Sequence, residues 1–407
     1  MKSISLLVSV LVTLALSGCG GGGGGTTSSS SSTSSNTTSV STFSGNVLTI
    51  TVNGSLCSSS TSSSYPNKPC VSVTICSPGT ATCQTVNDIL LDTGSYGLRI
   101  FGSVLTGVAP TQIASGSGSL AECVQFGDGS ALWGPVRTAD VIMGGEPAVQ
   151  VPIQVIDAGF GTAPTACQSA DATPAAAGFN GILGVGLHDY DCGTFCTLAS
   201  NGMYYSCTGT SCTATTAPLA NQVRNPVALL PLDNNGVIVK LPALGTGGAT
   251  SVTGSLILGI GTRANNIPSG VTSYPADQYA RFKTTFDGIT YSSSFLDTGS
   301  NGLFFPAPSS GSLPACSSPN AGWYCPPTTI NLSAITTGAT SLPSSTINFM
   351  IANANSLFLT SNSVFSELGG TYAGGFDWGL PFFLGRDVYV GMANKTSSLG
   401  TGPYWAY

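Results

Sequence analysis

The sequence predicts an all-β protein of two similar lobes that are cross-linked by disulfides. From Gly45 onward, short runs rich in Val, Ile, Thr and Phe alternate with Gly, Pro, Asn and Ser, and no long helical periodicity interrupts them. One motif occurs twice, as LLDTGSYGL at 90–98 and as FLDTGSNGL at 295–303. The chain also holds 13 cysteines, a number typical of a disulfide framework in an exported protein.

The composition excludes several classes of function. Only 7% of the 407 residues are charged, against roughly 25% in an ordinary soluble domain. The 11 Lys and Arg are scattered and the net charge is −6, so no basic surface for nucleic acid is expected. His188 is the single histidine, which excludes multi-histidine metal sites and leaves acid–base chemistry to carboxylates. Asp189 and Asp191 follow it without matching a calcium loop, and we expect neither a metal nor a cofactor.

The first residues have the pattern of an export signal. Lys2 precedes an apolar run over residues 4–16, which is too short for a comfortable transmembrane span. The sequence LSGC that ends at Cys19 resembles a bacterial lipobox. This resemblance implies that residues 1–18 are a lipoprotein signal peptide and that Cys19 carries a lipid. The alternative is an ordinary secretory signal with a chance cysteine.

Residues 19–44 are predicted to be a lipidated Gly/Ser/Thr tether. Such a composition cannot bury apolar surface and behaves as a flexible coil with an r.m.s. span of roughly 25–30 Å. The segment has no Lys or Arg, so we expect no basic pro-segment that must be removed. The lipid on Cys19 would place the protein in the bacterial cell envelope, anchored in the outer membrane and facing the periplasm or the cell surface.

The cysteines beyond Cys19 are even in number and suffice for six disulfides. Their pairing does not follow from the sequence. A metal site is the weaker interpretation, because no CxxC pair is present. Four pairs lie close together in the sequence: Cys76 and Cys83, Cys192 and Cys196, Cys207 and Cys212, Cys316 and Cys325.

The repeated motif divides the rest of the chain into two lobes. In each copy an apolar strand runs into Asp-Thr-Gly-Ser, and an apolar-apolar-Gly segment follows. Gly184 lies 92 residues after Asp92, and Gly385 lies 88 residues after Asp297. An Asp-Gly turn explains either copy alone but not the duplicated spacing, which indicates two similar units. The predicted lobes are 45–262, with the first DTGS, the flap and the ILG motif, and 263–407, with the second DTGS and the FLG motif.

From about Gly45 to Tyr407 the chain resembles the pepsin-like aspartic proteases, and within that fold a family of uncharacterised bacterial lipoproteins known as a domain of unknown function. The resemblance implies a bilobed double β-barrel with the active cleft between the lobes. In each lobe the apolar-apolar-Gly segment would cross the DTG loop. QFGDGS at 125–130 resembles the hairpin that closes over substrate, with Phe126, Gly127, Asp128 and Gly129 as its flap residues.

Asp92 and Asp297 are the candidate catalytic residues. Peptide hydrolysis by two carboxylates needs both within hydrogen-bonding reach of one water, and two like charges so close share one proton. The ionised member would take a proton from the water, and the protonated member would donate to the carbonyl oxygen. Glycines let the backbone approach the carboxylates. The resemblance assigns support of the dyad to Thr93, Gly94, Ser95, Thr298, Gly299 and Ser300.

Three positions depart from the pepsin-like pattern. Phe126 stands where the family has a flap tyrosine, and Arg99 stands where it has the tryptophan that pairs with this tyrosine. Asn180 replaces the usual Asp of the first crossing segment. None of these changes removes the dyad. Arg99 would favour ionised carboxylates if it lies near the dyad, and otherwise pairs with a surface acid.

The sequence thus favours a cell-envelope aspartic endopeptidase with a water activated by Asp92 and Asp297. The altered flap pair favours an alternative, a catalytically silent pepsin-like module that binds a peptide or protein in its cleft. A structural surface lipoprotein is a third reading. The expected partners are a peptide or protein and the membrane, through the lipid on Cys19, with no nucleic acid. The sequence does not indicate an oligomeric state.

Overall fold

The computed structural model describes residues 45–53 and 65–407. The predicted signal peptide 1–18, the tether 19–44 and the lipidation site Cys19 lie outside the described residues. The protein is all-β, with 43% strand and 11% helix. Within 45–53 and 65–407, no helix is both long and apolar enough to cross a membrane.

Alternating and continuous apolar runs explain the two kinds of strand. In β1 (Val47–Val52) every second side chain is buried, because Leu48, Ile50 and Val52 face inward. The end of β3 (Cys83–Asp92) is buried on both faces, in keeping with its unbroken run Ile-Leu-Leu-Asp. The alternating strand β1 therefore has one exposed face, whereas β3 carries Asp92 into the interior.

The strands of the first half of the chain are β1 (Val47–Val52), β2 (Pro69–Cys76), β3 (Cys83–Asp92), β4 (Tyr96–Phe101), β5 (Thr111–Gln112), β6 (Ala114–Ser115), β7 (Gly118–Gln125), β8 (Ala131–Ile142), β9 (Val149–Ile156), β10 (Gly181–Val185), β11 (Tyr204–Thr208), β12 (Ser211–Ala214), β13 (Gly236–Lys240) and β14 (Val252–Leu258). Those that follow are β15 (Ser273–Pro275), β16 (Phe282–Phe286), β17 (Ile289–Leu296), β18 (Leu303–Phe305), β19 (Ile330–Thr337), β20 (Ser344–Ile351), β21 (Gly369–Thr371), β22 (Asp377–Trp378), β23 (Asp387–Gly391), β24 (Thr396–Ser397), β25 (Gly400–Thr401) and β26 (Tyr404–Ala406).

The helices are all short. The α-helices are α1 (Pro174–Ala177), α2 (Ala354–Phe358) and α3 (Leu380–Phe383). The 3-10 helices are η1 (Gly102–Val104), η2 (Thr165–Cys167), η3 (Gly193–Thr197), η4 (Ala199–Asn201), η5 (Leu219–Asn221), η6 (Pro226–Leu229) and η7 (Ala264–Asn266).

One closed barrel and one half-barrel form the architecture. Six strands close the barrel in the order β2-β3-β10-β4-β9-β8 and back to β2. The second sheet has the order β20-β19-β16-β17-β22-β18-β21, and its two end strands do not pair with each other. The expectation of two barrels is therefore met in the first half only.

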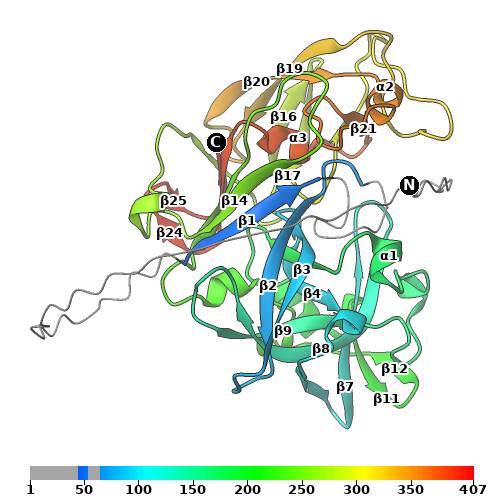
Figure 1. The fold of residues 1–407 in the computed structure, drawn as a ribbon, viewed down its shortest axis with the longest axis vertical. Coiled ribbons are helices and arrows are strands. Elements are labelled where there is room, and N and C mark those ends of the chain that lie inside the picture. Colours follow the sequence, from blue (N-terminus) through cyan, green and yellow to red (C-terminus); the bar gives the residue numbers. More distant parts are fainter. Residues whose placement is uncertain (1–44, 54–64) are drawn as a thin grey trace, which may run out of the picture. The chain divides into compact units, whose positions relative to one another are not determined.

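A shared sheet links the two halves of the chain. β1 pairs with β14, β14 with β13, and β13 with β23, which in turn pairs with β26. In Figure 1, β1 and β14 lie between the blue-green strands of the barrel and the yellow-to-red strands of the second sheet. The predicted second lobe, 263–407, thus supplies three strands, β15, β23 and β26, to a sheet whose other strands come from the first half of the chain.

Five disulfides are formed among the described residues. All four pairs that are close in the sequence are bonded, and the fifth bond joins Cys123 to Cys167. Cys70 is disulfide-bonded as well. Most of these bonds close short hairpins or turns, whereas Cys123–Cys167 spans 44 residues and ties β7 to η2.

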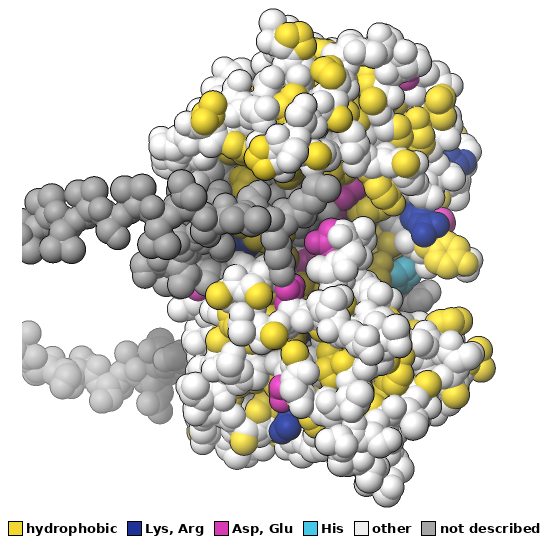
Figure 2. Space-filling view, turned by 90° about the vertical axis from the view of Figure 1, so that its right-hand side faces the viewer, with side chains coloured by type: hydrophobic (Ala, Val, Ile, Leu, Met, Phe, Trp, Pro, Cys, Tyr) yellow, Lys and Arg dark blue, Asp and Glu magenta, His cyan; other side chains and the backbone are white. Residues whose placement is uncertain are grey.

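Few charges reach the surface. Figure 2 shows a face on which neutral polar and apolar side chains predominate and Lys and Arg are sparse. The core of the second sheet is aromatic: Phe305 stacks on Phe376 with ring centroids 5.0 Å apart, and Trp378 packs against Phe376 and Phe349. This cluster fixes β22 beside the second DTGS loop.

Candidate active site

The structure brings the two predicted acids together. Asp92 is the last residue of β3, and Asp297 directly follows β17. Leu91 and Leu296 precede the two acids and are fully buried, so each strand delivers its carboxyl into the interior. The two side chains lie close enough for the charge of Asp92, and a side-chain hydrogen bond with it, to raise the pKa of Asp297.

The Asp92 carboxylate accepts three hydrogen bonds from its own loop. Its Oδ1 accepts from the backbone N–H groups of Gly94, at 2.7 Å, and Ser95, at 3.1 Å. Its Oδ2 accepts from the Ser95 hydroxyl at 2.5 Å. Hydrogen-bond donors are thus aimed at both carboxylate oxygens of Asp92.

Asp297 has different surroundings, which favour its protonated form. Its Oδ1 accepts from the Gly299 N–H at 2.7 Å, and its Oδ2 contacts the Ser300 hydroxyl at 2.8 Å. Burial raises the pKa of Asp297 well above its usual range, and the negative charges of Asp92 and Asp377 and the hydrogen bond to Asp92 raise it further. The pair therefore has the electrostatics to hold one proton, with Asp297 as its site.

Two threonines lock the loops together. The Thr93 N–H donates to Oγ1 of Thr298 at 3.1 Å, and the Thr298 N–H donates to Oγ1 of Thr93 at 3.0 Å. Each hydroxyl then donates across the contact, Thr93 to the Leu296 carbonyl and Thr298 to the Leu91 carbonyl. All four bonds are buried and join residues more than 200 positions apart, so they fix the distance between the two acids.

The strand that crosses the first loop is the predicted one. β10 runs parallel to β3 and antiparallel to β4, with Gly184 opposite Asp92. A Cβ at Gly184 would lie 2.6 Å from the backbone nitrogen of Tyr96, which explains the glycine.

The predicted second crossing segment is wrong. β22 is the strand that runs parallel to β17 and antiparallel to β18, and the glycine that follows it is Gly379. A Cβ at Gly379 would collide with the carbonyl oxygen of Gly302. Gly385 instead follows α3, where its N–H donates to the Leu241 carbonyl. Phe-Leu-Gly at 383–385 has the predicted apolar-apolar-Gly pattern, whereas the segment that crosses the loop is Asp-Trp-Gly at 377–379 and is recognised from its strand pairing.

The predicted flap is a hairpin tip between β7 and β8. The Phe126 N–H donates to the Ser130 carbonyl, and the Gly129 N–H to the Phe126 carbonyl. Asp128 accepts from the backbone and hydroxyl of Ser130, and Gly127 lies in open space. Gly129 has a φ of 86°, a conformation that favours glycine. Phe126 packs against a cluster of buried side chains in the barrel that includes Leu90, Phe101 and Ile182.

Tyr65 is a neighbour of the dyad that no sequence motif indicates. Its hydroxyl donates to the Gly299 carbonyl at 3.4 Å. Burial raises its pKa, as do the nearby charges of Asp128, Asp297 and Asp92. Tyr65 therefore lies close enough to Asp128 of the flap and to the two acids for their charges to affect its pKa.

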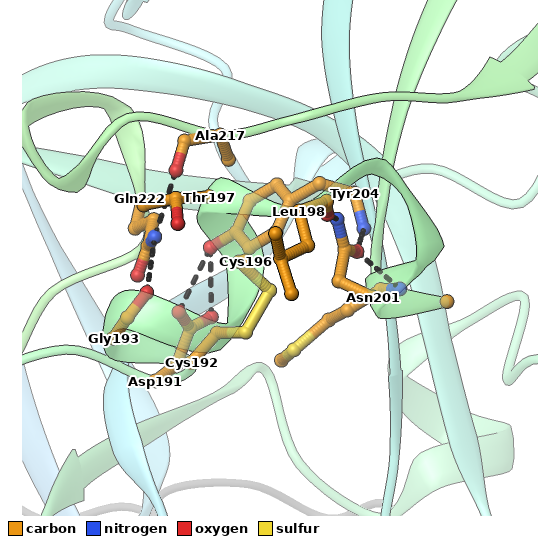
Figure 3. Close-up of a disulfide and its surroundings, with 12 residues drawn as sticks. Asp191, Cys192, Gly193, Cys196, Thr197, Leu198, Asn201, Tyr204, Ala217 and Gln222 are labelled. Atoms are coloured by element: carbon orange, nitrogen blue, oxygen red, sulfur yellow. Dashed lines mark hydrogen bonds between the residues drawn. A yellow bond between two sulfur atoms is a disulfide. The ribbon is translucent and has the colours of Figure 1, made fainter.

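Arg99 serves neither of its expected roles. Its guanidinium is fully buried and donates to Oε1 of Glu122 at 2.7 Å and to Oδ2 of Asp191 at 3.0 Å. Figure 3 shows Asp191 beside the Cys192–Cys196 disulfide, where the Tyr204 hydroxyl also donates to it. One cation faces two buried acids, and burial together with Glu122 raises the pKa of Asp191 well above its usual range. Arg99 thus stabilises interior acids, which are neither the dyad nor surface groups.

The other polar candidates have structural partners. Asp189 pairs with Arg224 at 2.5 Å, and the His188 ring packs edge-on against Tyr96 at 5.1 Å. Asn180 donates to the Asn87 carbonyl. No group of three His, Cys, Asp or Glu side chains is arranged to hold a metal ion in the part of the chain that the structure describes.

The fold and site define an all-β protein in which two copies of one loop present a pair of interacting carboxyls, that of buried Asp92 and that of half-buried Asp297. The chain belongs to the family described as protein of unknown function DUF3443, whose family model matches residues 42–407. None of the curated proteins matches this chain.

Proposed function

We propose that this protein is a pepsin-like aspartic endopeptidase of the bacterial cell envelope, held at the membrane by a lipid on Cys19. The observation that carries the proposal is the asymmetric carboxyl pair. Asp92 is buried and accepts hydrogen bonds from three donors, whereas Asp297 is half-buried and has a raised pKa. Such a pair combines a general base and a general acid in one place.

The proposed reaction uses only these two acids and a water molecule. Asp92 takes a proton from the water, whose oxygen attacks the carbonyl carbon of the peptide bond, while Asp297 gives its proton to the carbonyl oxygen. A tetrahedral gem-diol results. Asp92 then passes its proton to the amide nitrogen, the C–N bond breaks, and Asp297 recovers a proton from a gem-diol hydroxyl. Protons and charge balance over the cycle.

The supports for this mechanism lie in the loops. The threonine bonds keep the acids within reach of one water, and Ser95 and Ser300 fix their outer oxygens. Tyr65 lies beside the second loop, close enough to Asp128, Asp297 and Asp92 for their charges to raise its pKa. With few charges in the chain, we expect the substrates to be extended peptides with apolar or neutral side chains.

A second candidate is a catalytically silent module that binds a peptide. Phe126 at the flap tip has no hydroxyl, and Tyr65 occupies a position beside the second loop where substrate would approach. The same fold would then capture a chain segment without cleaving it.

One experiment separates the two candidates. The full-length protein is incubated with a denatured protein at pH 3–7, with and without a statyl-type transition-state mimic. A peptidase gives fragments that the mimic suppresses. A silent module gives no fragments while it retains the peptide, and fragments that persist with the mimic present contradict a dyad mechanism.

A further inference from the structure

The hydroxyl of Ser300 lies between two carboxyl groups. Its Oγ is 2.8 Å from Oδ2 of Asp297 and 2.6 Å from Oδ2 of Asp377. A serine hydroxyl carries one proton and donates one hydrogen bond at a time. The second of these short contacts must therefore take its proton from a carboxylic acid.

Asp377 has the surroundings of a protonated acid. It is only 8% exposed, and its second oxygen, Oδ1, is buried without a hydrogen-bond partner among the described residues. An ionised carboxylate there would leave a negative charge without solvation. Burial accordingly raises the pKa of Asp377 to about 8, and the charge of Asp92 contributes to the rise.

The elements packed around Asp377 bring no positive charge. β22 lies between β17 and β18, and Tyr291 on β17 is the only titratable side chain of those two strands. Tyr291 packs on the ring of Phe376. α3, which follows β22, has no titratable residue. The charged groups that act on Asp377 are Asp92 and, across Ser300, Asp297.

The first half of the chain has no equivalent of Asp377. Asp377 pairs with Phe295, two residues before Asp297, and Ile182 pairs with Leu90, two residues before Asp92. Ile182 therefore occupies the matching position and has no proton to give. The two loops are alike in sequence, but the second has an additional acid behind its serine.

We propose that Asp377 is a third carboxyl of the active site, a positioning residue that donates its proton to Ser300 and so holds the Ser300 hydroxyl on Asp297. This inference rests on the proposed function, because it names how the same site is regulated. When a base in solution removes the proton from Asp377, the Ser300 hydroxyl turns to the new charge. Asp297 then loses its outer hydrogen bond, and the site loses its geometry.

Two variants test the role of Asp377 on the full-length protein. Asp377→Asn keeps an N–H donor for Ser300 without a titrating proton, whereas Asp377→Ile reproduces the first half of the chain. We expect Asp377→Asn to keep kcat at pH 5 within about twofold and to extend activity by about one pH unit to higher pH. Asp377→Ile should lower kcat about tenfold with KM within about twofold, since Asp377 does not touch substrate. Asp387→Asn, an exposed acid paired with Lys240, is the control.

The proposal is overturned if both variants keep the wild-type pH profile, or if Asp377→Asn loses as much kcat as Asp377→Ile. An infrared difference spectrum between wild type and Asp377→Asn gives a readout that does not need activity. At pH 6 it should contain the C=O band of a protonated carboxylic acid, and a carboxylate band in its place contradicts the inference. Absence of cleavage by the wild type with the acid band present would sink the proposed function alone.

Discussion

Gly94 of the first loop lies directly against the carboxyl group of Asp297 from the second. A Cβ at Gly94 would be 2.6 Å from Cγ of Asp297, and a Cβ at Gly299 would be 3.0 Å from Cγ of Asp92. Neither glycine has a left-handed φ. Glycine is therefore required at these positions by the opposite acid rather than by the backbone, which explains why the motif occurs as a pair.

Gly94→Ala should strongly lower peptidase activity. The added methyl group cannot coexist with the Asp297 carboxyl, because real Cβ atoms do not approach other heavy atoms this closely. We expect kcat to fall by about 10²-fold or more, since small misplacements of reacting groups have effects of that size. Gly245→Ala is the matched control, because a Cβ there meets nothing within 4 Å. Equal rates for the two variants would contradict the close contact.

Thr298→Val should destabilise the protein and slow cleavage. The change removes the donor to the Leu91 carbonyl and the acceptor for the Thr93 N–H, and leaves both groups buried. Each unsatisfied group costs about 1–3 kcal/mol. Urea unfolding measures the loss, and Thr298→Ser, which keeps the hydroxyl, should recover most of it. Thr85→Val, on an exposed pair, should change the free energy of unfolding by less than about 0.5 kcal/mol.

Arg99→Met should be among the most damaging substitutions. It leaves Glu122 and Asp191 buried without their cation, a loss of about 3–5 kcal/mol at neutral pH. Adding Glu122→Gln should restore part of that stability, because one uncompensated charge disappears. Arg281→Met, at an exposed position, is the control. A double variant no more stable than Arg99→Met would show that the charges are not the cause.

The free energy of unfolding should decrease as pH rises from 5 to 7.5. The pKa values of Asp191, Asp297 and Asp377 are raised in the folded state, that of Asp377 from 3.8 to about 8. Their contribution is complete below about pH 4 and is lost as pH rises through the folded pKa values. His188 and Lys68, whose pKa values burial lowers, act in the opposite direction, whereas Glu146, whose pKa burial raises, adds to the decrease. Urea unfolding at the two pH values measures the slope, and Asp377→Asn should make it shallower. A stability that rises over this interval contradicts the protonated acids.

The sequence was sufficient to predict the all-β class and the meeting of Asp92 with Asp297, because a repeated local motif carries that information. The four cysteine pairs close in sequence could be noted but not assigned, and Cys123–Cys167 depends on the β7–η2 contact. The half-barrel was not predictable, since whether end strands pair is decided by the whole sheet.

The errors at the site have one physical origin. Gly385 follows two apolar residues, whereas Gly379 follows Asp377 and Trp378, and the pairing of β22 with β17 is what selects Gly379. Asp377 has no motif of its own, because its role comes from its distance to Ser300. Arg99 likewise finds Glu122 and Asp191 through long-range packing, 23 and 92 residues away.

The most direct test of the account is the rate at which full-length Asp297→Asn cleaves a denatured protein at pH 5, relative to wild type and Asp387→Asn. An amide at this position cannot supply the acid proton, although it fills the same space. We expect cleavage by the wild type and by Asp387→Asn, and a fall of about 10³-fold or more for Asp297→Asn. A rate for Asp297→Asn within about twofold of the wild-type rate would contradict catalysis by the Asp92–Asp297 pair.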